Sequence, residues 1–185
     1  MESTSKQLLQ DLLEITRENL NTVEHLKAQP INLLNWKQGP ENWSALECIE
    51  HLNRYGDFYI PEITNKIKTS KHKNSELFKS NWLGNYFSKS VSYNESLNKM
   101  KTFKSMNPLN SKLDIQTLHK FINQQHQLIE LLDKSKFVNL DKTKTAISIS
   151  KLIKLKLGDT FRVLIYHNER HIKQAEKALN KAKWH

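Results

Sequence analysis

The sequence is poor in the residues that crosslink a chain or break its regular structure. It has one cysteine, Cys48, which excludes an internal disulfide framework and a cysteine-based zinc finger. It has four glycines and four prolines, and a chain with so few turn formers favours long helices over many short strands. No apolar run approaches the roughly 18 residues that a membrane span needs, so we expect no membrane partner.

The amino-terminal residues contain no recognisable targeting signal. Residues 1–6 lack the basic and apolar segments of a secretory signal, and the single cysteine fits a reducing compartment, so we expect a cytoplasmic protein. The chain of 185 residues is expected to form one domain over residues 1–185, because this length buries a sizeable core without crosslinks.

Arginine is also scarce, although the net charge is +10. Only four of the 29 basic residues are arginines, the side chain best suited to bidentate contacts with phosphates and bases. The lysines are scattered, and no recognisable nucleic-acid-binding motif accompanies them. We therefore favour a solvated lysine-rich surface over a nucleic-acid or acidic-membrane partner. A steep salt dependence of DNA affinity would favour nucleic acid instead.

Apolar residues recur at helical spacing in four long segments. They predict helices over residues 4–28, 44–69, 115–134 and 158–183. Ser44 and Glu47 form the pattern of a capping box at the start of the second helix. Pro61 should kink this helix or end it near Ile60. Four long helices with two long connections predict an all-α fold, an up-down-type four-helix bundle of antiparallel helices.

The connections are less regular. Aromatic and apolar residues between 78 and 87 predict a short amphipathic helix, and the remainder of residues 69–114 should pack over the bundle as a long crossover. Residues 147–157 look extended and predict a short strand or an apolar loop. Trp36, Trp43 and Trp82 should pack the end of the bundle, although Trp43 could instead line the mouth of a pocket.

The last predicted helix carries two histidines, His167 and His171. Residues at i and i+4 share a helix face, with Cβ atoms about 5–6 Å apart. Both imidazoles can therefore point at one ion, and neutral imidazole binds zinc, nickel, copper and iron. The same spacing also arises by chance on solvated faces. The metalloprotease motif is excluded, because Glu169 is one residue, or about 100°, away from the required position.

Other candidate ligands are ambiguous on their own. His51 lies at the edge of the apolar stripe of the second helix, where a partly buried core histidine is the usual role. Cys48 precedes it by one turn and could approach a metal, but a small buried apolar residue is the commoner case. His119 and His126 are two turns apart, about 10.5 Å along the axis. This distance is too long for both to bind one ion, so we expect them to be surface residues.

Two blocks of sequence add to this interpretation. The first block consists of LNWK (34–37) and WSALECIEHL (43–52), and the second consists of LGDT (157–160) and HNERHIKQA (167–175). The order and spacing of the two blocks match those of two helices in a known protein family. The first block resembles the start of the second helix in the DinB-like family of metal-dependent enzymes, and the second block resembles that family's last helix. WLG (82–84) is also similar, so the resemblance spans nearly the whole chain.

The resemblance implies a four-helix bundle with a long crossover and a divalent metal held by His51, His167 and His171. We expect zinc or nickel, since all three ligands are nitrogen. Three protein ligands leave positions open, as in catalytic rather than structural sites. Some relatives of the fold are thiol-dependent transferases. The implied partners are a small-molecule substrate, for instance a low-molecular-weight thiol, and a second copy in a homodimer.

Three functions are therefore weighed. The leading one is a metal-dependent hydrolase or thiol S-transferase, whose substrate and catalytic residues the sequence does not name. The alternative is a non-catalytic metal- or ligand-binding protein of a stress response, and a basic nucleic-acid-binding protein comes third. The three histidines separate the first two from the third, and turnover alone separates the first from the second.

Overall fold

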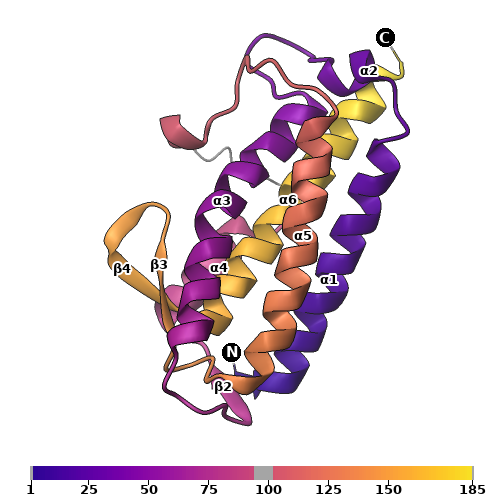
Figure 1. Cartoon of the computed structure of the whole chain (residues 1–185). Coiled ribbons are helices and arrows are strands. Elements are labelled where there is room, and N and C mark those ends of the chain that lie inside the picture. The colour runs from indigo at the N-terminus through magenta and orange to yellow at the C-terminus, as the bar shows by residue number, and fades with distance from the viewer. Residues whose placement is uncertain (1, 94–101, 185) are drawn as a thin grey trace.

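The structure is a computed structural model, and it describes residues 2–93 and 102–184. This part of the chain is mostly helical (Figure 1). The helices are α1 (Ser5–Leu26), α2 (Ile31–Asn35), α3 (Ala45–Thr69), α4 (Trp82–Val91), α5 (Gln116–Lys134) and α6 (Leu157–Ala182). The strands are β1 (Glu2–Thr4), β2 (Leu77–Lys79), β3 (Lys144–Ile147) and β4 (Ser150–Lys156). Two short 3₁₀ turns are η1 (Lys104–Met106) and η2 (Ser135–Phe137).

The four long helices α1, α3, α5 and α6 lie where the apolar periodicity predicts them. Their stripes meet in two clusters of buried residues, one in each half of the long axis. Each cluster takes side chains from all four helices, for example Leu12, Ile63, Leu128 and Phe161 in one, and Val23, Ile49, Phe121 and Ala175 in the other. Burial of these apolar faces is the main force that holds the long helices together.

The directions of these helices do not alternate throughout. In Figure 1, α1 and α6 run one way and α3 and α5 run the other way. The parallel pair is visible in its contacts. Asn53 Nδ2 donates to Thr117 O at 3.0 Å, and further along both helices, one turn on α3 and two turns on α5, Gln124 Nε2 donates to Asp57 Oδ1 at 2.9 Å. The expected antiparallel arrangement therefore does not hold for α3 and α5. The long crossover returns the chain to the end at which α3 begins.

The start of α3 is fixed as the sequence predicts. Ser44 Oγ accepts from the Glu47 backbone at 3.1 Å, and Glu47 Oε2 accepts from the Ser44 backbone at 2.9 Å, which completes the capping box. Of the two effects predicted for Pro61, an end of the helix near Ile60 does not occur, since α3 continues through Pro61 to Thr69, the predicted end of this helix. Pro61 has no N–H for the carbonyl of Asp57, but Asp57 is exposed, so water can solvate that oxygen.

The crossover packs against α6 and the amino terminus. β2 pairs with β1 in antiparallel register, with Ser3 opposite Phe78, and α4 follows along α6. The predicted short helix is thus found as a strand followed by a helix. Trp82 is 78% exposed, so the expectation that it packs the bundle end is wrong. It is the first residue of α4, whose buried face is formed by Gly84 and Ser88 instead.

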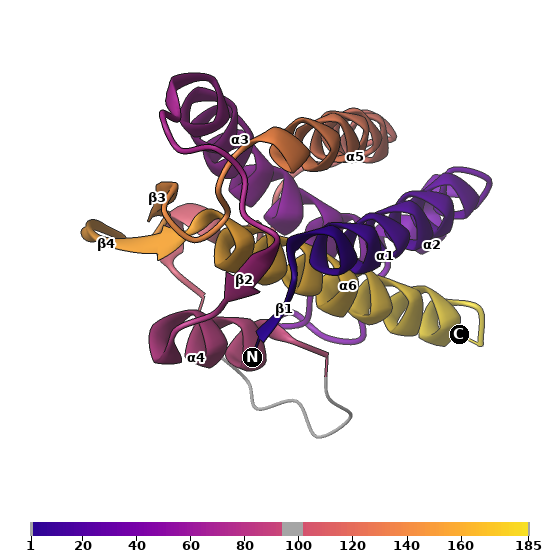
Figure 2. The ribbon, with the colours of Figure 1, turned by 90° about the horizontal axis from the view of Figure 1, so that it is seen from below.

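Residues 144–156 form the extended segment that the sequence predicts. β3 and β4 pair as an antiparallel hairpin, with Thr145 opposite Leu155. Seen from below in Figure 2, the hairpin lies beside α6, between α3 and α4. Among the helices of the described residues, none has both the length and the apolar character that crossing a membrane requires.

A buried ion pair attaches α4 to α6. Arg162 Nη1 lies 2.9 Å from Asp159 Oδ1, and both side chains are almost fully buried. The same guanidinium donates to Asn85 Oδ1 on α4 at 3.1 Å, and Ser80 Oγ donates to Asp159 Oδ1 at 2.5 Å. The backbone of Gly84 lies so close that a Cβ there would be 2.1 Å from Asp159 Cγ. α4 can dock only because residue 84 has no side chain.

We predict that Gly84→Ala lowers the free energy of unfolding by about 1–3 kcal/mol, because the added methyl group displaces the buried Asp159 carboxylate from its partners. This figure is the net change, after the gain of about 1 kcal/mol in helix propensity from glycine to alanine. Chemical denaturation measures the change. Gly39→Ala is the control, since its Cβ would meet only the Asn42 side chain, at 3.2 Å. Equal stability of the Gly84 variant and the parent would contradict the prediction.

Candidate metal centre

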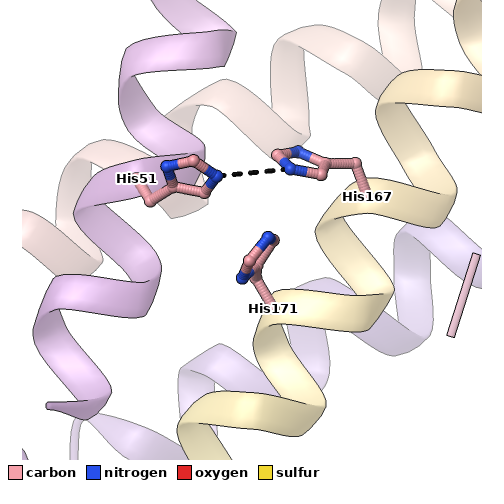
Figure 3. A group of neighbouring side chains, drawn as sticks. All are labelled: His51, His167 and His171. Carbon is pink, nitrogen blue, oxygen red and sulfur yellow. Dashed lines mark hydrogen bonds between the residues drawn. The ribbon is translucent and has the colours of Figure 1, made fainter. Parts of the chain in front are cut away.

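Three histidines from two helices converge at one point between α3 and α6 (Figure 3). His51 comes from α3, and His167 and His171 come from consecutive turns of α6. Each offers a ring nitrogen, and these three nitrogens all lie within 4.8 Å of one another. His51 Nε2 and His167 Nε2 are 3.3 Å apart. The three residues singled out in the sequence thus form a group that could hold a metal ion.

The antiparallel packing of α3 on α6 produces this convergence. The i, i+4 pair places His167 and His171 on the face of α6 that contacts α3. The His51 ring lies opposite both, with centroid distances of 5.0 Å to His167 and 4.5 Å to His171. His51 is buried, and the other two are partly buried. The site is therefore enclosed by the core on the α3 side and more open on the α6 side.

Two aromatic side chains of the α3 region line the cluster. Trp43, just before α3, has its ring centroid 4.7 Å from that of His51 and 5.7 Å from that of His171. Tyr55, one turn after His51, lies 4.6 Å from the His167 ring. Trp43 thus contacts the histidine cluster, and its role at a pocket mouth stays a prediction. These rings reduce the water around the imidazoles and keep them close together.

The hydrogen bonds of two imidazoles determine which nitrogen is free. His51 Nδ1 is 2.7 Å from the carbonyl oxygen of Met106, and His171 Nδ1 is 2.9 Å from Gln174 Oε1. Both oxygens only accept, so each Nδ1 carries the proton of its neutral ring. The Nε2 atoms of both rings then hold lone pairs. This is the arrangement that metal-binding histidines adopt, with one nitrogen fixed by an acceptor and the other left for the ion.

Burial keeps the cluster uncharged. Desolvation lowers the pKa of His51 to about 4, a fall that the Met106 carbonyl opposes and the charge of Arg54 assists. Desolvation likewise lowers the pKa of His171 to about 3, with His51 and Arg170 adding to the effect. The pKa of His167 is well below its usual value, first through burial and then through the two neighbouring histidines. At neutral pH all three rings are therefore uncharged, and each has one nitrogen with a lone pair.

These observations fit a divalent metal ion. The potential ligands are three neutral imidazoles, which suit zinc, nickel, copper or iron rather than calcium or magnesium. Two of the three rings are already held by acceptors on their other nitrogen. The residues present are therefore compatible with the group that the resemblance implies.

The remaining candidates lie outside the cluster. Cys48 is fully buried in the apolar core, and burial together with the Glu47 charge raises the pKa of its thiol, so it is the small core residue that was favoured. His119 and His126 are exposed on α5, as expected. Cys48 is thus a packing residue of α3 rather than a ligand.

Sequence reasoning missed the groups that orient and line the site. Tyr55 and Gln174 had a detectable signal, since they follow His51 by four residues and His171 by three, on the same helix faces. The Met106 carbonyl had none. It is a backbone atom 55 residues away from His51 in the chain, and only the path of the crossover brings it there.

Comparison with known proteins assigns the chain to a family. The family model described as the DinB superfamily matches residues 12–175, a range that includes all three histidines. No curated protein and no solved structure matches the chain significantly.

We predict that Cys48 resists thiol reagents in the folded protein, because the reagent needs an exposed thiolate and this thiol is buried with a raised pKa. Labelling with Ellman's reagent at pH 8 should proceed only as fast as the core opens. It should become rapid in denaturant. Fast labelling of the native protein, at the rate of a free thiol, would show that the α3 core is open at this point.

Proposed function

Because the chain belongs to the DinB superfamily, we propose that it is a metal-dependent enzyme, a hydrolase or a thiol S-transferase, with a divalent ion held by His51, His167 and His171. One observation carries this proposal. The three ring nitrogens lie within 4.8 Å of one another, and the two rings with a fixed Nδ1 acceptor keep Nε2 free for an ion. Zinc or nickel is the ion that we favour, since every donor is an imidazole nitrogen.

The side chains around the ion have separate roles. The three histidines hold it, while the Met106 carbonyl and Gln174 keep two of the rings oriented. Trp43 and Tyr55 reduce access of water, which strengthens electrostatic interactions inside the site. When bound, the ion acts as a Lewis acid that lowers the pKa of a water or thiol nucleophile toward neutrality.

The substrate side of the site favours a small molecule. Three protein ligands are the pattern of catalytic sites, which keep room for an exogenous ligand. Burial raises the pKa of Tyr55 to about 12, so this ring stays uncharged at neutral pH beside the cluster. A low-molecular-weight thiol is a suitable substrate, because a thiolate is a good ligand for zinc and nickel.

A non-catalytic metal- or ligand-binding role in a stress response uses the same site and differs only in turnover. The fold and the cluster support both functions, and the transferase or hydrolase is preferred because the ligands are three rather than four. The expectations that residues 1–185 form a single domain, that the chain is a homodimer and that it is cytoplasmic stay predictions.

We predict that the protein binds about one divalent ion per chain and that His167→Ala or His171→Ala weakens this binding by more than about 100-fold, since even loss of an orienting partner costs 10–100-fold. His126→Ala is the control, because this exposed histidine on α5 should leave the affinity unchanged. Elemental analysis of untagged protein and competition titration with zinc and nickel measure the effect. An unaltered affinity in the His167 variant would exclude the site.

We predict that the metal-loaded protein turns over substrates in a screen of thiol transfer and ester or amide hydrolysis. Activity should disappear with a chelator, return with zinc or nickel and be absent in His167→Ala, because each treatment removes the Lewis acid. Bound metal without turnover across the screen would favour the non-catalytic alternative.

A further inference from the structure

A short segment of the crossover lies against the first half of α3. These residues, 105–110, are called the strap below. Arg54 of α3 holds one end of it, since Nη1 donates to the carbonyl oxygens of Ser105 at 3.3 Å and Asn107 at 2.8 Å. Hydrogen bonds from a guanidinium to carbonyl oxygens are charge-assisted and stronger than neutral ones. The path of the strap backbone is therefore set by a side chain of α3.

Glu47 holds the other end of the strap. Its Oε1 accepts from the Asn110 backbone at 2.6 Å and from Lys37 Nζ at 2.7 Å, and Lys37 also donates to Asn110 Oδ1 at 3.0 Å. Asn110 has φ 63°, in the left-handed region that costs most residues energy and that asparagine tolerates. In the middle, Trp43 Nε1 donates to Asn107 Oδ1 at 3.2 Å.

Between the two residues whose carbonyls Arg54 binds, the Met106 carbonyl accepts from His51 Nδ1 at 2.7 Å. Glu47, His51 and Arg54 stand at positions i, i+4 and i+7 and so share one face of α3. One helix face thus carries both the ligand histidine and the two charged side chains that place its acceptor. The Nε2 atom of the same ring is 3.3 Å from His167 Nε2.

We propose that Arg54 and Glu47 are positioning residues of the metal centre: by fixing the two ends of the strap, they make the Met106 carbonyl hold the His51 ring with its proton on Nδ1 and its Nε2 directed at His167 and His171. Without the strap, either nitrogen of the neutral ring carries the proton, and a ring protonated on Nε2 offers no lone pair to the ion. The effect on metal affinity rests on the proposed function, whereas the tautomer of His51 is a property of the metal-free protein.

A purely structural role is the competing interpretation. In that case the strap closes one end of the bundle, and Arg54 and Glu47 contribute only to stability. The two interpretations differ in what happens to the His51 ring when an anchor is removed.

Arg54→Met is the central variant, because methionine keeps much of the length of the side chain and removes every donor. Lys66→Met is its matched control, since Lys66 forms the i, i+4 ion pair with Glu62 on the same helix and has no contact with the strap among its described interactions. The first measurement is long-range ¹H–¹⁵N NMR of the imidazoles in metal-free protein at neutral pH. We expect the Nδ1–H form of His51 in the parent and in Lys66→Met, and a mixture of tautomers in Arg54→Met.

The second measurement is the zinc affinity of the same proteins by competition titration. Loss of an orienting partner should weaken binding about 10–100-fold in Arg54→Met. The charge change alone predicts the opposite sign, because removing a cation beside His51 favours a bound metal ion. Arg54→Lys should be intermediate, since an ammonium keeps the charge but cannot span both carbonyls in the same way. Glu47→Gln keeps the capping pattern and should also shift the tautomer, because it weakens the second anchor.

The outcomes separate the two ideas. An unchanged His51 tautomer in both Arg54→Met and Glu47→Gln, with zinc affinity equal to that of the parent, overturns the positioning role. If the parent binds no metal, the proposed function fails and the tautomer shift alone decides the positioning role. If Arg54→Met does not fold, Arg54→Lys and Glu47→Gln decide it by the same two measurements.

Discussion

The antiparallel packing of α3 against α6 is the constraint on which the rest of the structure depends. It sets His51 opposite His167 and His171 and places Tyr55 against His167 in the adjacent turn. A slide of one turn along the axis, about 5.4 Å, would exceed the distance that now joins the three ring nitrogens. The two apolar clusters lock this register, because each contains residues of both helices. The core thus places the three histidines opposite one another, while the hydrogen bonds to Met106 and Gln174 orient two of the rings.

Enclosure by the core also determines the chemistry of the cluster. The same desolvation lowers the pKa of all three histidines, so protons do not compete for their nitrogens at neutral pH. A proton binds to one ring nitrogen, whereas a divalent ion could be coordinated by all three nitrogens, which would then share its charge. Burying a polar imidazole costs free energy that burying an apolar side chain does not.

The sequence was most informative where a pattern is local. The bounds of α1, α3, α5 and α6 follow from apolar periodicity, and the capping box of Ser44 and Glu47 was confirmed in detail. The pairing of His51 with α6 came from the family resemblance, because no local rule links residues 116 positions apart. The parallel direction of α3 and α5, the exposure of Trp82 and the Met106 acceptor depend on the path of the crossover. That path is set by contacts between residues far apart in the chain, such as the hydrogen bond from Arg162 on α6 to Asn85 on α4, which a single helix pattern does not contain.

The position of α6 after α1, α3 and α5 in the chain has a consequence for the folding of the nascent protein. Both apolar clusters and two of the three histidines require it, so a nascent chain that still lacks α6 has neither a complete core nor a complete ligand set. Closing contacts over more than a hundred residues is also slow, since loop entropy is lost before the contacts form. The three histidines can therefore come together only after α6 has left the ribosome, because two of them lie on this helix.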